Sequence, residues 1–316
     1  MPLVTHTARD QSVRMSARRT DSLWLFRVWG IDVYLHWAWL FVAFIQISYR
    51  ANAYSSIGWK VVEYLALFFI VLLHEFGHAL ATRQVGGTAD QILLWPLGGV
   101  AYVSPPPRPG AELWSIAAGP LVNVVFFFVF SLALVIKGIP LNAGGLSDFD
   151  ALLRNVWFIN TALLFFNLLP VYPLDGGQIL RALLWFVIGR ARSMYVASVV
   201  GFLGAAALGL WALKQQSIWL GIITFYLISN CRRGWAHAKA LTALEQIPRR
   251  REYTCPACHT HPPIGPVWRC HECGTEFDTF ETRGRCPNCQ ITFPTTICID
   301  CRKSFPLAEW TPTMPE

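Results

Sequence analysis

The sequence His74-Glu75-Phe76-Gly77-His78 follows directly on the apolar run from Val61 to Leu73, in a stretch typical of a membrane-spanning helix. The two histidines are four positions apart, so on a helix both imidazoles project from one face and can bind a single Zn²⁺. Glu75 lies beside them, where it can take a proton from a metal-bound water. Imidazole and carboxylate groups are costly at membrane depth, so the pattern predicts a metal site rather than two core histidines.

The composition is that of a protein with several membrane spans. Of the 316 residues, 54% are hydrophobic and 14% are charged, whereas a soluble domain carries about a quarter charged residues. We predict about six spans, each approaching the roughly 20 apolar residues that cross a bilayer. They are expected near residues 33–47, 59–82, 113–136, 152–167, 195–213 and 218–229.

The basic residues predict the orientation of these spans. Much of the formal net charge of +7 flanks the spans, so this charge is not by itself a nucleic-acid signal. Most of the arginines and lysines around the spans fall on the side of the two termini. The positive-inside rule therefore predicts a multi-pass protein of the cytoplasmic membrane with both termini in the cytosol and His74 near the cytosolic face.

The chain divides by composition into a membrane core and a cysteine-rich tail. The expected segments are a disordered basic arm (1–28), a six-helix core (29–235), a basic linker (236–252), a double zinc ribbon (253–304) and a tail (305–316). Within the core, residues 91–103 are expected to form a β-hairpin, because Gly98-Gly99 splits two short β-type runs. The predicted fold class is an all-α polytopic membrane protein with a small membrane-associated hairpin and a small zinc-ribbon domain.

Eight of the nine cysteines form four Cys-x-x-Cys pairs, a spacing that predicts zinc rather than disulfides, and with it a reducing compartment. Two consecutive four-cysteine ribbons are the simplest arrangement, and an interleaved one, first pair with third and second with fourth, is the alternative. His259, His261 and His271 are close enough to replace a cysteine. The cysteines concerned are Cys255, Cys258, Cys270, Cys273, Cys286, Cys289, Cys298 and Cys301.

The remaining features of the tail have open interpretations. Cys231 is expected to be a plain juxtamembrane cysteine, with palmitoylation as the alternative. For the ligand of the ribbons, a protein partner is favoured over nucleic acid. Arg249 to Arg251 are candidates for contact with anionic lipid at the inner leaflet.

Two histidines leave a catalytic zinc one protein ligand short. Asp175 is the best candidate for the third ligand, because it lies in a segment whose two prolines and two glycines break the helix. An N-cap for the next helix is the alternative, but an isolated carboxylate there would lack a counter-charge. Asp90 and Glu112 are rival ligands in expected polar loops. Asn123 in the third span could serve equally as helix–helix contact or beside the site.

Three motifs, taken together, resemble the site-2 protease family of intramembrane metalloproteases: His74-Glu-Phe-Gly-His78, Gly119-Pro-Leu-Val-Asn123 and Asn167-Leu-Leu-Pro-Val-Tyr-Pro-Leu-Asp175-Gly. The end of the hairpin, Pro96 to Ala101, is also similar. The resemblance covers about residues 30–230. It implies that His74, His78 and Asp175 bind the catalytic zinc and that Glu75 is the general base. It also implies that Asn167 orients the substrate or polarises its carbonyl, and that the substrates are membrane-bound regulatory proteins cut within a transmembrane segment.

A helical substrate hides its carbonyls in hydrogen bonds and must unwind before it is cut. We expect the hairpin to receive it by strand addition, with Asn123, Ile92, Leu94, Gly98 and Gly99 as substrate-binding residues. Proline at Ile92 or Leu94 is then expected to abolish cleavage without releasing zinc. No stretch between the spans suits a PDZ domain, and the tail is too short for paired CBS domains.

Two other classes of function compete with a protease. The first is a membrane-anchored zinc-ribbon adaptor or scaffold whose membrane core has no catalytic activity. Such a protein would need no base such as Glu75 beside two zinc ligands. A zinc transporter would carry acids and histidines on several spans, whereas here the polar residues converge on one site. The expected cofactors are one catalytic and two structural zinc ions. The expected partners are the bilayer, a single-pass transmembrane substrate and a protein bound by the ribbons.

Overall fold

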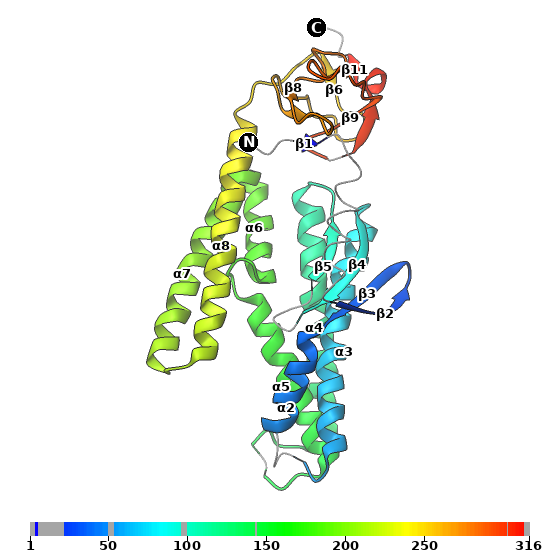
Figure 1. Ribbon diagram of the computed structural model, residues 1–316. Coiled ribbons are helices and arrows are strands. Elements are labelled where there is room, and N and C mark those ends of the chain that lie inside the picture. The colour runs from blue at the N-terminus through cyan, green and yellow to red at the C-terminus, as the bar shows by residue number, and fades with distance from the viewer. Residues whose placement is uncertain are drawn as a thin grey trace. The chain divides into compact units, whose positions relative to one another are not determined.

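The computed structural model describes residues 4–5, 22–49, 54–95, 100–142, 144–301 and 303–312. The chain forms two compact units (Figure 1). Arg19–Trp235 make up the first, which we call the membrane unit. Met1–Arg18 and Ala236–Glu316 make up the second, which we call the cysteine unit.

Helices make up most of the membrane unit. Their bounds are α2 (Ala38–Tyr49), α3 (Ile57–Gln84), α4 (Pro109–Lys137), α5 (Asp148–Leu168), α6 (Asp175–Ile188), α7 (Arg190–Lys214) and α8 (Ile218–Glu245). The last part of α8, from Ala236, belongs to the cysteine unit. Helix α4 contacts α3, α5 and α6, so it lies at the centre of the unit. Within the described part of the chain, four helices are long and apolar enough to cross a membrane, namely α3, α4, α5 and α7. The protein is therefore an integral membrane protein, and the count of six spans stays a prediction.

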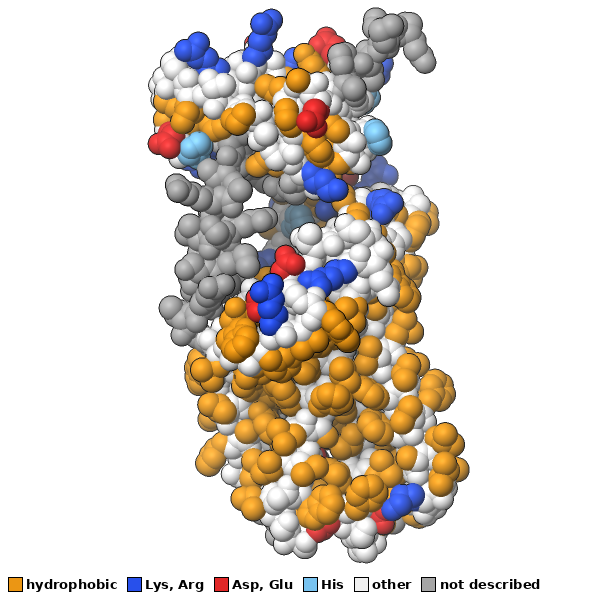
Figure 2. All heavy atoms as spheres, turned by 90° about the vertical axis from the view of Figure 1, so that its right-hand side faces the viewer, with side chains coloured by type: hydrophobic (Ala, Val, Ile, Leu, Met, Phe, Trp, Pro, Cys, Tyr) orange, Lys and Arg blue, Asp and Glu red, His pale blue; other side chains and the backbone are white. Residues whose placement is uncertain are grey.

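The outer surface of these helices is apolar. Phe128 and Leu132 on α4 and Leu203 on α7 are all at least 60% exposed. Figure 2 shows hydrophobic side chains covering most of the lower part of one face, with a few charged side chains at its end. Apolar surface of this extent is stable against lipid rather than water.

A four-stranded sheet packs on one side of α3. Strands β2 (Ser22–Val28), β3 (Ile31–His36), β4 (Thr88–Leu94) and β5 (Val100–Ser104) lie in that order. β3 and β4 pair in parallel, and the two outer pairs are antiparallel. The buried face of the sheet forms one core cluster with α3, which includes Ile31, Val33, Leu72, Phe76, Ile92 and Leu94. β4 is therefore an inner strand, and within the described part of the chain β5 is a free edge of the sheet.

Two expectations for the start of the chain are wrong. Residues 22–28, expected in a disordered arm, form β2, and residues 33–36, expected in the first span, belong to β3. Trp29 and Gly30 have φ angles of 50° and 74°, as both central residues of a type I′ hairpin turn require. The helix that follows, α2, has only 12 residues. The first expected span is thus a hairpin followed by a short apolar helix.

Short strands and turns make up the cysteine unit. They are β1 (Val4–Thr5), β6 (Tyr253–Thr254), β7 (Trp268–Arg269), β8 (Glu276–Phe277), β9 (Thr295–Ile297), β10 (Ser304–Pro306) and β11 (Thr311–Pro312). β7 pairs with β1 and β8, β9 with β10, and β6 with β11. Trp268 and Trp310 are buried at the centre of the unit. Residues 304–312, most of them expected in a tail, therefore complete this unit, and residues 236–245, expected in a linker, are the last turns of α8.

The basic residues after α8 are bound within the cysteine unit. Arg249 donates hydrogen bonds to both carboxylate oxygens of Asp300, at 2.7 and 3.2 Å. Arg250 donates to a carboxylate oxygen of Asp278 at 2.7 Å. Because these guanidinium groups are held by carboxylates of their own unit, the expected contact with anionic lipid does not hold for Arg249 and Arg250.

Candidate metal and catalytic site

His74 and His78 project from one face of α3, and their Nε2 atoms are 3.1 Å apart. Asp175 faces them, with one carboxylate oxygen 3.1 Å from Nε2 of His74 and the other 3.6 Å from Nε2 of His78. Donors bound tetrahedrally to zinc at its usual bond lengths lie about 3.3–3.5 Å apart. The three side chains therefore lie where the ligands of one zinc ion would lie. Asp175 is the first residue of α6, and no side chain caps this helix, so the N-cap alternative does not describe it.

The second ring nitrogen of each histidine is bound behind the site. Nδ1 of His74 lies 2.6 Å from Oδ1 of Asn123, and Nδ1 of His78 lies 2.9 Å from the carbonyl oxygen of Ser115. Both partners are acceptors, so we assign the ring proton to Nδ1 in each case, which leaves both Nε2 lone pairs facing Asp175. Hydrogen bonds of this kind orient the histidines of metal sites.

Asn123 is held in place by a second amide. Its Nδ2 donates to Oδ1 of Asn160 at 2.9 Å, and Nδ2 of Asn160 donates to the carbonyl oxygen of Asn123 at 2.9 Å. Asn123 is 1% exposed, and both ends of its amide are used by His74 and Asn160. Asn123 therefore lies beside the site and holds His74. It also lines the cavity described below, so the expected substrate contact stays a prediction.

Gly119 lies where α4 passes closest to the two histidines. A Cβ atom at this position would overlap Nε2 of His78 and would lie 2.9 Å from Nε2 of His74. Gly77 allows the close approach of the two helices from the side of α3, since a Cβ there would lie 2.7 Å from the carbonyl oxygen of Ala118. The two glycines bring the helices together and keep the space in front of the ring nitrogens open. This space is a cradle that fits a metal ion and that a side chain would fill.

Glu75 lies on the same turn of α3 and is 5% exposed. One of its carboxylate oxygens accepts a hydrogen bond of 3.0 Å from the backbone N–H of Ala101 on β5. The edge strand of the sheet thus fixes the carboxylate beside the three ligand side chains. A buried carboxylate held next to a metal site is suited to general base chemistry.

A cavity of about 490 Å³ opens in front of these side chains. The residues that line it include Trp95 directly after β4, Val103 of β5, Asn167 of α5, Gln178 of α6 and Tyr226 of α8. A helix with its side chains is about 10–12 Å across, too wide for a cavity of this size. The cavity therefore suits a short extended segment.

Other expected site residues lie elsewhere. Ile92 and Leu94 are fully buried in the core between β4 and α3, so the expected substrate contacts at these positions are wrong. Gly98 and Gly99 lie outside the described residues. Of the rival ligands, Asp90 pairs with Arg83 at the surface, and Glu112 is buried on α4.

Three positions around the site were not expected from the sequence in these roles. Asn160 carried a signal, because a buried amide such as Asn123 needs a partner and few side chains of the fourth span can supply one. Gly119 belongs to a quoted motif, but only the structure shows which atoms a side chain there would meet. Ser115 acts through its backbone carbonyl, for which a sequence carries no signal.

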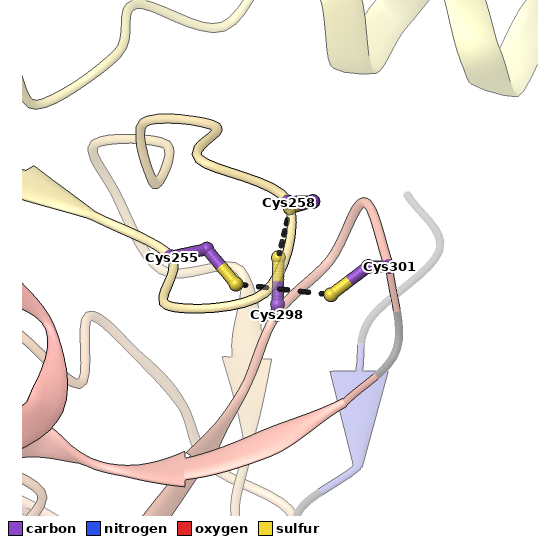
Figure 3. A group of neighbouring side chains, drawn as sticks. All are labelled: Cys255, Cys258, Cys298 and Cys301. Atoms are coloured by element: carbon purple, nitrogen blue, oxygen red, sulfur yellow. Dashed lines mark hydrogen bonds between the residues drawn. The ribbon is translucent and has the colours of Figure 1, made fainter. Parts of the chain in front are cut away.

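The eight paired cysteines form two clusters in a nested order. Cys255 and Cys258 meet Cys298 and Cys301 (Figure 3), and the second and third pairs form the other cluster. Neither the consecutive nor the interleaved arrangement is present. The Sγ distances between the pairs are 3.7 Å in the outer cluster and 3.5 and 3.6 Å in the inner one. Thiolates bound tetrahedrally to one zinc lie about 3.8 Å apart, so both clusters fit the ion.

Each of the first three Cys-x-x-Cys pairs begins the same kind of turn. Its first cysteine accepts, at the backbone carbonyl, a hydrogen bond from the N–H four residues on, at His259, Gly274 and Gln290. These three residues all have positive φ, so His259 is a turn residue rather than a ligand. Within the described chain, neither cluster includes a histidine. Hydrogen bonding to Thr275 lowers the pKa of the Cys273 thiol to about 5, which favours the thiolate that zinc binds.

The nested order can be tested by counting zinc in paired serine variants. Cys255→Ser with Cys298→Ser should remove one zinc per chain, because both residues belong to the outer cluster. Cys255→Ser with Cys270→Ser should remove two, because one cysteine is lost from each cluster. A consecutive arrangement would give the opposite counts, so elemental analysis of the two purified variants distinguishes the arrangements.

Comparison with known proteins gives consistent matches. The model of peptidase family M50 matches residues 62–144 and 141–210. A zinc metalloprotease of Methanocaldococcus jannaschii is 35% identical over 208 residues, which are 65% of this chain and 58% of that protein. A Synechocystis protein named as a candidate zinc metalloprotease is 28% identical over 236 residues, 69% of this chain and 61% of that protein. The structure of the site-2 protease from Methanocaldococcus jannaschii matches with a TM-score of 0.50 and 31% identity, covering 68% of this chain and 95% of that chain.

The chain therefore belongs to peptidase family M50, and it is a site-2 protease-like member of that family. The family match lies within the membrane unit, which holds the histidine pair and Asp175. The chain spans 58% and 61% of the length of the two relatives above.

Proposed function

We propose that the chain is an intramembrane zinc metalloprotease that cleaves the transmembrane segments of membrane-bound regulatory proteins. The observation that carries this proposal is the convergence of His74, His78, Asp175 and Glu75 on one cavity of a membrane-spanning unit. Membership of peptidase family M50 supports it, as do relatives whose names describe zinc metalloproteases.

In the proposed reaction, His74, His78 and Asp175 hold the catalytic ion. Bound there, zinc supplies an activated water and polarises the scissile carbonyl. Glu75 takes the proton of the attacking water and passes it to the leaving amine, while the N–H of Ala101 keeps its carboxylate pointed at the cavity. Asn167 lines the cavity, where its amide can donate a hydrogen bond to the substrate.

We further propose two structural zinc ions in the cysteine clusters and a protein partner for the cysteine unit. Both termini would lie in the cytosol, on the side of the membrane to which the catalytic site is closer. The nested turns and thiolate distances support the structural ions. The basic residues around the spans support the orientation.

The proposed function is tested in cells that carry either the native protein or Glu75→Gln. Membrane fractions are compared by quantitative proteomics over several growth conditions. Single-pass proteins cut only by the native protein should accumulate with the variant, and their full-length forms are candidate substrates. No difference under any condition would contradict the proteolytic function and favour a membrane-anchored adaptor.

The free edge of the sheet is the expected docking strand for an unwound substrate. The N–H of Ala101 points away from β4 toward Glu75, so the N–H of Val103, two residues on, faces the same free edge. Val103→Pro removes this donor and should slow cleavage of a substrate identified as above about tenfold, with zinc content unchanged. Val103→Ala keeps the donor and is the control. Equal cleavage by the two variants would rule out strand addition at this edge.

A further inference from the structure

An ion pair is buried between α4 and α6 close to the proposed catalytic site. A guanidinium nitrogen of Arg181 donates a hydrogen bond to a carboxylate oxygen of Glu112, and the two side chains are 10% and 8% exposed. Among the residues that the structure describes, it is the one side-chain hydrogen bond that joins these two helices. Burying two charges is costly, and such pairs are often no more stabilising than apolar residues of the same size. Stability alone therefore gives little reason for this pair.

The pair lies on the same helix surface as the groups that shape the site. On α4, Glu112, Ser115 and Gly119 have the spacing i, i+3, i+7 and share one face. Ser115 holds His78 through its carbonyl, and Gly119 opens the cradle. Seven residues of helix on α4 rise about 10 Å, and the six from Asp175 to Arg181 on α6 rise about 9 Å. The pair thus joins the two helices about two turns from the ligands.

We propose that Glu112 and Arg181 are positioning residues that fix α6 along α4 and so hold Asp175 within bonding distance of the metal. This inference rests on the proposed function, in which Asp175 is the third zinc ligand. A slip of one residue moves a helix about 1.5 Å along its axis, whereas metal–ligand distances tolerate about 0.2 Å. Apolar contacts are non-directional, but a charge-assisted hydrogen bond has a preferred geometry and resists such a slip.

The test separates positioning from stability by replacing the whole pair. Single variants Glu112→Gln and Arg181→Met leave one buried charge unpaired and should lower both the unfolding temperature and zinc affinity. The double variant Glu112→Leu with Arg181→Met leaves no charge, so the zinc-free protein should unfold near the native temperature. Its affinity for the catalytic zinc should still be at least about tenfold below native.

Zinc affinity is measured by chelator competition on the full chain in lipid nanodiscs, with thermal unfolding of the zinc-free protein alongside. The catalytic ion is the one that His78→Ala lacks, and the two cysteine clusters are an internal reference. As the matched control, Lys137→Met with Asp150→Leu removes the partly exposed ion pair between α4 and α5 and should leave zinc affinity unchanged.

Native affinity for the catalytic zinc in the Glu112→Leu, Arg181→Met protein would overturn the positioning role while leaving the proposed function intact. If the His78→Ala protein instead binds as much zinc as the native protein, this result would contradict the proposed function itself. If the double variant does not fold, Arg181→Lys replaces it. Because lysine restores the charge pair, the Arg181→Lys protein should bind the catalytic zinc at least about tenfold more tightly than the Arg181→Met protein. Equal zinc affinity of these two variants would overturn the inference.

Discussion

Gly119→Ala should abolish cleavage because it removes the catalytic zinc. The added methyl group would overlap Nε2 of His78 and crowd Nε2 of His74, the two atoms that would bind the ion. Moving α4 away from the histidines would also separate Ala118 from Gly77 and lose the close packing of the two helices. One histidine must therefore rotate off the site. We expect at least about a 100-fold loss of affinity for this zinc, measured by chelator competition, and loss of cleavage in parallel.

The matched control lies on the same helix. A Cβ at Gly110 would come no closer than 3.8 Å to Phe186, an ordinary contact, so Gly110→Ala should keep both zinc and activity. Both variants add one methyl group to α4, and they differ in the atoms that this methyl group contacts. Gly119→Ala protein that retains the catalytic zinc and normal cleavage would contradict the assigned geometry of the site.

Glu75→Gln should have the second large effect, on the reaction and not on the metal. Glutamine keeps the size of the side chain and can still accept the hydrogen bond from Ala101, but it cannot take a proton from water. General base catalysis contributes about 10²–10⁴-fold, so the cleavage rate should fall by that factor with the zinc count unchanged. The measurement is single-turnover cleavage of a purified substrate beside elemental analysis.

Glu63 provides the control for Glu75. It is a buried glutamate of the same helix, bonded to Asn155 at 3.0 Å, and it does not line the cavity. Glu63→Gln should leave the cleavage rate of the folded protein within about twofold of native, since any effect acts on stability. A rate loss of equal size in both variants would argue that buried carboxylates support the fold and that Glu75 has no special role.

The sequence allowed the metal site to be predicted because its main signals are local. Helical spacing brings His74 and His78 onto one face, and a carboxylate in a broken membrane segment, such as Asp175, needs a partner. The structure brings the three side chains together, with distances of 3.1 to 3.6 Å between their ligand atoms. For Asn123, the sequence left two roles open, a helix–helix contact or a position beside the site. A choice between them required knowledge of the residues that surround it in the structure.

The sheet and the cysteine order could not be predicted for physical reasons. Exposed apolar residues such as Leu23 and Trp24 obscure the alternation of β2, so the stretch shows no strand pattern and fell within the expected arm. In the sequence, Gly30 was the one local sign of a tight hairpin turn at Trp29-Gly30. For the cysteines, four Cys-x-x-Cys pairs with identical spacing carry no information about their partners. The structure shows what the spacing does not, namely that Cys255 and Cys298 lie in one core with Trp268 and Trp310.

The nested cysteine clusters also imply an order of assembly. The inner cluster closes a loop of 13 residues between Cys273 and Cys286, and the outer one closes 40 residues between Cys258 and Cys298. The entropy of closing the longer loop costs about 1 kcal/mol more. Once the inner loop is closed, the outer one is effectively shorter, so the first of the two proposed structural zinc ions would ease the binding of the second. When zinc is added back to the metal-free protein, the inner cluster is therefore expected to fill before the outer one.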